Sequence, residues 1–292
     1  MAETKIEILS GTVCELGEGP SYDPAADTLW WFDIVGRRLF EHRFADGSET
    51  AHDLPEMASA VAVVDDKRQM IATETGLHLR DLASGRLEMV APIEADNPAT
   101  RSNDSRVHPA GAFWVGTMGK QAEKRAGSIY WYRAGETRRI LPDITITNGI
   151  CFSPAGDIAY FADTGRNIMF RVECDPETGL PRGEPTVFVD DRGTPGGIDG
   201  SVCDADGNIW NARWGCARLD VYDPSGKRTR SIDLPPSRTS CPAFAGPEAN
   251  RIAVTSALQG MNAEERAADP DGGKTFIVDL AVKGRHEPRV RL

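Results

Sequence analysis

Residues 199–210 read DGSVCDADGNIW, and they contain a pattern that recurs along the chain. The pattern begins with an oxygen-bearing side chain, continues as a short run typical of a strand, and passes through a turn into a second apolar run. Residues 148–158 (NGICFSPAGDI) and 103–114 (NDSRVHPAGAFW) have the same order, and residues 18–30 (EGPSYDPAADTLW) have it with a turn one residue longer. We therefore predict that the chain repeats one structural unit.

The units follow one another roughly every 40 to 50 residues, and each has about four short strand candidates without helical periodicity. Two further units of weaker similarity contain residues 60–64 and 241–246. Such a period is typical of propeller blades, so we predict an all-β fold, a six-bladed β-propeller with about four antiparallel strands per blade. Six blades account for residues 1–292 as a single domain, and a β-sandwich or two barrels is the structural alternative. We expect residues 4–10 to pair with the last blade and close the ring.

The composition restricts the partners and the cellular compartment. The 292 residues include 33 Lys and Arg against 44 Asp and Glu, and the formal net charge of −11 argues against binding of nucleic acid or of an anionic membrane. No apolar run approaches the length of a membrane span, and the N-terminal residues do not resemble a signal peptide. The six cysteines include no C-x-x-C pair, so we expect reduced thiols in a cytoplasmic protein, with Cys151 and Cys203 in the core. The oligomeric state is left open.

The first side chain of the pattern has similar chemistry in four units. Glu18, Asn103, Asn148 and Asp199 each stand five positions before the turn. If the units are blades around an axis, these side chains lie at equivalent places near one mouth of the central channel. Two carboxylates and two amides suit a hard divalent cation, so we predict a metal site in that channel. The alternative is that the Asn-Gly and Asp-Gly pairs at 148–149 and 199–200 are ordinary turn dipeptides.

Other catalytic chemistries lack their sequence signals. The five histidines have no zinc-ligand spacing, and the chain contains no G-x-S-x-G motif, phosphate loop or dinucleotide fingerprint. The acidic segment 268–272 (ADPDG) lacks the ligand spacing and the closing Glu of a calcium loop, so we interpret it as a surface turn. A site built from oxygen ligands is therefore the leading interpretation.

Several motifs resemble those of the senescence marker protein (regucalcin)/gluconolactonase family of six-bladed propellers, and the similarity covers nearly the full length. The matching motifs are GEGP (17–20), RSND (101–104), GTM (116–118), TNG (147–149) and DG (199–200). The resemblance implies that Glu18, Asn148 and Asp199 bind one divalent metal ion. Calcium, zinc, magnesium, manganese and iron(II) would each suit such a site. It also implies that Arg101 and Asn103 contact a sugar lactone.

Two departures from the family pattern concern the substrate more than the metal. Ile198 precedes Asp199 where the family usually has proline, and residues 119–121 read GKQ where some relatives have acidic residues that touch the substrate. The sequence therefore leaves the preferred sugar open.

The resemblance implies metal-dependent hydrolysis of a sugar (aldono-)lactone to the corresponding sugar acid. The metal would polarise the carbonyl group, and Asp199 would act as general base. Arg101 could instead be a structural arginine paired with a carboxylate, and Asp104 could brace Arg101 or its loop. Two alternative functions are hydrolysis of another lactone, ester or organophosphate, and divalent-metal binding by a non-catalytic propeller.

Overall fold

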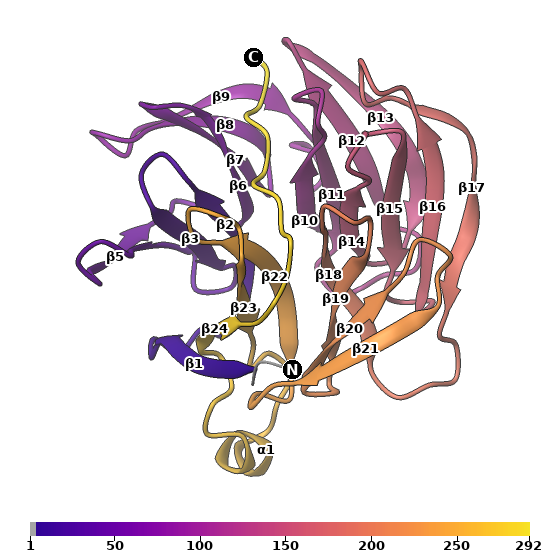
Figure 1. Ribbon diagram of the computed structural model, residues 1–292. Helices are drawn as coiled ribbons and strands as arrows, with labels where there is room; N and C mark the ends of the chain where they lie inside the picture. Colours follow the sequence, from indigo (N-terminus) through magenta and orange to yellow (C-terminus); the bar gives the residue numbers. More distant parts are fainter. Residues whose placement is uncertain (1–3) are drawn as a thin grey trace.

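The chain forms six four-stranded antiparallel sheets in the computed structural model, which describes residues 4–292. The sheets are arranged around a common axis (Figure 1). The first strands of neighbouring blades contact one another around the ring, so they line the central channel. This arrangement confirms the predicted six-bladed propeller, and the alternative of a sandwich or two barrels is wrong. That the whole chain behaves as a single domain stays a prediction.

The strands follow the chain blade by blade. Blade 1 contains β2 (Gly17–Asp23), β3 (Thr28–Asp33), β4 (Arg38–Arg43) and β5 (Glu49–Asp53). Blade 2 contains β6 (Ala58–Asp65), β7 (Arg68–Thr73), β8 (Gly76–Asp81) and β9 (Leu87–Pro92). Blade 3 contains β10 (Thr100–Val107), β11 (Phe113–Gly119), β12 (Gly127–Arg133) and β13 (Glu136–Ile144).

The second half of the ring repeats this order. Blade 4 contains β14 (Thr147–Phe152), β15 (Ile158–Asp163), β16 (Ile168–Cys174) and β17 (Pro181–Asp190). Blade 5 contains β18 (Gly197–Cys203), β19 (Ile209–Trp214), β20 (Arg218–Tyr222) and β21 (Arg228–Asp233). Blade 6 contains β22 (Thr239–Ala245), β23 (Arg251–Ser256), β24 (Thr275–Asp279) and the N-terminal β1 (Lys5–Ser10).

The N-terminal strand closes the ring, as the sequence predicts. β1 pairs with β24 in antiparallel register, with Lys5 opposite Asp279 and Glu7 opposite Ile277. The first strand of the chain thus becomes the outermost strand of the last blade. The pairing removes the hydrogen-bonding edge that β24 would otherwise expose.

One short helix interrupts the all-β architecture. α1 (Ala263–Ala268) lies between β23 and β24, although the sequence analysis finds no helical periodicity. Its N-cap is Asn262, whose side chain accepts from the backbone N–H groups of Glu264 and Glu265. The side chain of Glu265 accepts from the backbone N–H of Asn262 in return, which completes a capping box. The acidic segment 268–272 continues as a turn after this helix. No helix within residues 4–292 is long and apolar enough to cross a bilayer.

The hydrophobic core lies between adjacent blades. In one cluster Trp114 of blade 3 packs against Phe152 of blade 4, with ring centroids 5.3 Å apart. All six cysteines are free, and Cys151 and Cys203 are buried, as predicted. The second strands are covered on both faces, and β3 is buried along its whole length, whereas the outermost strands β5, β13 and β21 are mostly exposed.

Every inner strand has a β-bulge at the position where the sequence pattern begins. The register with the neighbouring strand shifts between Glu18 and Ser21 in β2, and between Asn148 and Cys151 in β14. Similar shifts occur in β6, β10, β18 and β22. A bulge bends the strand and re-aims its side chains. The Asn-Gly and Asp-Gly pairs therefore lie inside strands, and the alternative that they are ordinary turns is wrong.

Candidate active site

A cavity of about 350 Å3 lies at the mouth of the channel where the bulges occur. It is lined by all five residues that the sequence analysis assigns to the site: Glu18, Arg101, Asn103, Asn148 and Asp199. They come from the inner strands of blades 1, 3, 4 and 5, so no single blade contains the site. The structure brings the five side chains together, while their roles stay predictions.

The three expected metal ligands are buried around this cavity. Glu18 is 6% exposed, and Asn148 and Asp199 are each 4% exposed. Asn148 Nδ2 donates to Thr164 Oγ1 at 2.9 Å, which leaves its carbonyl oxygen on the opposite side. The main-chain carbonyl of Asp199 accepts from Asn211 Nδ2 at 2.7 Å, so a buried amide holds this strand at its bulge.

Hydrogen bonds link the inner strands of three blades. Asn103 Nδ2 donates to Asn148 Oδ1 at 3.0 Å and to the Thr147 carbonyl at 2.8 Å. Thr164 Oγ1 in turn donates to the carbonyl of Ile198 at 2.6 Å. This series runs from blade 3 through blade 4 to the residue before Asp199, so it fixes the relative positions of the site side chains.

Burial raises the pKa values of both site carboxyl groups. The pKa of Glu18 rises to about 8, because burial and the charge of Asp104 outweigh the Gly19 N–H bond and the nearby Arg101 and Arg106. The pKa of Asp199 is also raised well above its ordinary value, first by burial and then by the charge of Glu18. Because burial opposes the ionisation of both carboxyl groups, a cation between them would stabilise their ionised forms.

The residue types fit a divalent metal of the hard or borderline class. Two carboxylates and an amide oxygen are ligands that such ions accept, and the raised pKa values give a physical reason for the ion to bind. Within residues 4–292 no three His, Cys, Asp or Glu side chains form a metal-binding group. The candidate set has two carboxylates only, so the amide of Asn148 must complete it.

Arg101 presents a buried positive charge to the cavity. The residue is 7% exposed, and its Nη1 donates to the Ser102 carbonyl at 2.8 Å and to Asn103 Oδ1 at 2.7 Å. Burial lowers its pKa to about 10, although Glu18 and Asp199 oppose that shift. Among residues 4–292 no carboxylate lies within ion-pairing distance of Arg101, so the structural ion pair considered above is not seen.

Asp104 braces a neighbouring strand and not Arg101. Its Oδ2 accepts from the backbone N–H of Ile150 at 2.7 Å, and its Oδ1 lies 3.9 Å from Nη2 of Arg106. Burial raises its pKa to about 6, and Arg106 limits the rise. Of the two supports considered above, a contact between Asp104 and Arg101 is not seen, because the side chain points toward blade 4; a purely structural role for Asp104 stays a prediction.

The rim of the cavity contains residues that the sequence analysis does not assign. Thr164, Trp214 and Gln259 line the cavity, and Lys120 lies beside them and is ion-paired with Glu74. Most of these residues stand at or just after the end of a blade's second strand. That end lies beside the start of the antiparallel first strand, so strand order could have indicated them.

Comparison with known proteins assigns the chain to a family. A sequence profile described as the SMP-30/gluconolactonase/LRE-like region matches residues 16–258. The chain belongs to this family. Membership confirms the resemblance seen in the sequence motifs.

Named relatives of this SMP-30/gluconolactonase family protein cover almost its whole length. A Rhizobium meliloti protein with the provisional name of sugar lactone lactonase is 50% identical, over 97% of this chain and 96% of its own. An L-arabinolactonase of Azospirillum brasilense is 35% identical, over 95% of this chain and 92% of its own length. A crystal structure of a calcium-binding protein, regucalcin, from Agrobacterium tumefaciens has 49% sequence identity and a TM-score of 0.96. The match covers 98% of this chain and 97% of that protein's chain. The family protein described here is an ester hydrolase of the lactonase type.

Proposed function

We propose that this protein hydrolyses a sugar lactone to the corresponding sugar acid, and that a divalent metal ion held by Glu18, Asn148 and Asp199 is required. The observation that carries the proposal is the single cavity that these residues share with Arg101 and Asn103. Its volume of about 350 Å3 is sufficient for a small sugar ring and attacking water. The lactonase relatives support the same reaction class.

The metal ion, when bound, would polarise the lactone carbonyl as a Lewis acid. Asp199 would take a proton from the attacking water on a carboxylate oxygen and return it to the ring oxygen as the ester bond breaks. One water is consumed, and the product is an open-chain hydroxy acid. Arg101 would donate hydrogen bonds to the carbonyl or hydroxyl oxygens, and Asn103 would orient Asn148 and the substrate.

The ligand set does not select one metal. Oxygen ligands of mixed charge accept calcium, magnesium, manganese, iron(II) and zinc, and metal availability contributes to the choice. The Agrobacterium relative described as calcium-binding supports including calcium. The lactonase relatives oppose the alternative of a metal-binding propeller without catalysis, so the second candidate function is hydrolysis of another lactone, ester or organophosphate.

The decisive experiment measures acid release from a panel of xylono-, arabinono-, galactono- and gluconolactones. The protein is first stripped with a chelator and then resupplied with one divalent metal at a time. We expect turnover above spontaneous hydrolysis on one or two lactones, and only with added metal. Turnover that survives stripping would contradict the metal requirement. Metal binding without turnover on any lactone of the panel would favour hydrolysis of another lactone, ester or organophosphate.

A further inference from the structure

The residues that follow β24 cross the propeller instead of ending at its rim. Residues 283–291, which we call the C-terminal strap, run over the middle of the ring (Figure 1). The ring of His286 lies 5.5 Å from that of Tyr22 in blade 1. Hydrogen bonds join the strap to the other blades through Ala205, Ala249, Gly246, Phe152, Val63, Gly111 and Ala134. These contacts lie at the ends of the inner strands opposite the candidate active site, so the strap covers the second mouth of the channel.

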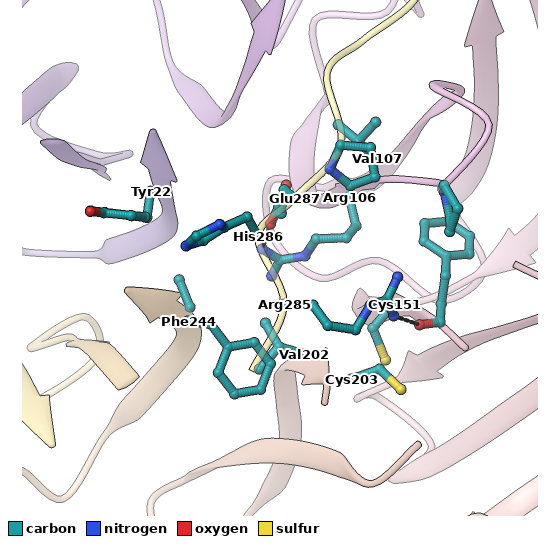
Figure 2. A pocket seen from close by; sticks show the side chains of 14 residues that line it. Tyr22, Arg106, Val107, Cys151, Val202, Cys203, Phe244, Arg285, His286 and Glu287 are labelled. Carbon is teal, nitrogen blue, oxygen red and sulfur yellow. Dashed lines mark hydrogen bonds and ion pairs between the residues drawn. The ribbon is translucent and has the colours of Figure 1, made fainter. Parts of the chain in front are cut away.

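One strap side chain reaches into the channel. Glu287 forms an ion pair with Arg106 of β10, and Figure 2 shows the two side chains together. The side chain of Arg106 is 7% exposed and that of Glu287 is 20% exposed. Arg106 also donates to the carbonyls of Ile150 (Nε, 3.4 Å) and Ser201 (Nη2, 3.2 Å). Each of these residues follows a proposed metal ligand by two positions. Arg106 therefore contacts the strands that carry two of the ligands, on the side toward the strap.

Counted in the ionised forms that a bound cation would favour, the groups along the channel have an unbalanced charge. Four carboxylates face two guanidinium groups, and all but one of the six residues are less than a tenth exposed. They are Glu18, Asp104, Asp199 and Glu287 against Arg101 and Arg106. The net charge of −2 matches one divalent cation. Arg285 is not counted, because it is half-buried at the outer mouth, where its Nη1 donates to the Phe152 carbonyl.

We propose that Glu287 is a positioning residue of the metal site, and that the C-terminal strap supplies the negative charge that neutralises Arg106 beneath the bound cation. The proposal rests on the proposed function. Without Glu287 the channel groups would have a net charge of −1, and a bound dication would leave an uncompensated positive charge in a buried site. Buried charge of this kind is strongly disfavoured, so the affinity for the cation falls.

The test uses manganese(II), whose free ion is counted by electron paramagnetic resonance during titration of chelator-stripped protein. We expect Glu287→Gln to raise the dissociation constant about ten-fold or more. Arg289→Gln is the matched control, because it removes the strap's exposed ion pair with Asp66 and leaves the channel unchanged. That variant should bind manganese(II) within about two-fold of wild type. Melting temperatures of all metal-free variants report whether each one is folded.

A double variant separates charge from packing. Glu287→Gln combined with Arg106→Gln restores the net charge of −2, so we expect the double variant to recover most of the affinity that Glu287→Gln loses. Glu287→Asp keeps the negative charge and should therefore bind manganese(II) nearly as tightly as wild type. A Glu287→Gln protein that melts lower but binds manganese(II) like wild type would overturn the proposal. So would a double variant as weak as the single one. No binding by wild-type protein would overturn the metal site itself, whereas equal binding by wild type and Glu287→Gln would overturn only this inference.

Discussion

Glu18 and Asp199 come from different blades, and burial in the cavity is the main cause that opposes the ionisation of each. The charge of Asp104 adds to the effect at Glu18, and the charge of Glu18 adds to it at Asp199. Because the folded-state pKa of Glu18, about 8, lies above its unfolded value of about 4.3, the folded protein favours the protonated form. The resulting stability is fully present below pH 4.3 or so and is lost as the pH rises through about 8. A bound cation would remove this dependence, since it stabilises the ionised carboxylates.

We therefore predict that Glu18→Gln stabilises the metal-free protein at high pH while it abolishes tight metal binding. With chelator present, the variant should melt at a higher temperature than wild type at pH 8.5, which corresponds to a gain on the order of a few kcal/mol in unfolding free energy. At pH 4.5 the two proteins should melt at similar temperatures. Glu184→Gln, on the exposed part of β17, is the control and should change neither value. Equal melting of wild type and Glu18→Gln at pH 8.5 would contradict the raised pKa of Glu18.

Asp199 is the residue that separates metal binding from proton transfer. Asp199→Asn keeps an oxygen that can bind the metal but removes the base, so we expect kcat to fall about 100- to 10,000-fold. The fold should survive, because the carbonyl that Asn211 contacts is main chain. Steady-state kinetics at saturating metal and a melting curve measure the two effects. Asp190→Asn, at the exposed end of β17, is the control, and near-normal kcat in Asp199→Asn would exclude this residue as the base.

The bulged inner strand is the element that aims the site side chains. Gly19 follows Glu18 with φ of +55°, and a Cβ placed on it would lie 2.0 Å from the carbonyl oxygen of Ser59 in blade 2. A side chain at this position must therefore push two inner strands apart. Glycine is needed here for both reasons, conformation and close approach.

We predict that Gly19→Ala costs far more stability than Gly47→Ala. Gly47 also has a positive φ, of +70°, but a Cβ added there would meet no atom within 4 Å, so only backbone strain of about 1 kcal/mol is expected. Denaturant unfolding measures both values. Gly19→Ala should lose several times as much stability and should bind metal more weakly, because Glu18 is displaced. Equal losses in the two variants would show that the strands can move apart without cost.

At the scale of the whole molecule, closure depends on a strand from the opposite end of the chain. β1 completes blade 6, and Ile6 packs against the core cluster between blades 5 and 6, whereas Ile8 is 48% exposed. We predict that Ile6→Ala lowers the free energy of unfolding by about 1–2 kcal/mol and that Ile8→Ala changes it by less than about 0.5 kcal/mol. Thermal or denaturant unfolding measures both. Equal effects would mean that β1 contributes its backbone pairing and little packing.

The predicted single domain can be tested in the same experiments. If all six blades unfold together, loss of packing at Ile6 shifts one cooperative transition for the entire ring. A separate early transition confined to part of the signal would show that blade 6 opens independently.

The number of blades, and the position of the site residues within each repeated unit, could be predicted from local patterns in the sequence. A repeated order of oxygen-bearing residue, strand and turn requires equivalent environments, so residues such as Glu18, Asn148 and Asp199 could be expected at one mouth of the channel. The family motifs added Arg101, whose position within its unit is not part of the repeat. These features depend on neighbours close in the chain, which is why they could be read without a structure.

Contacts between distant segments were decided only by the tertiary structure. Asp104 turns toward Ile150 and not toward Arg101, and Glu287 meets Arg106 although 181 positions separate them. Neither the strap nor the ion pair between Lys120 and Glu74 follows a repeat, so no period in the sequence points to them. Charges brought together in a buried channel interact through space, and their balance depends on the three-dimensional arrangement of the whole ring.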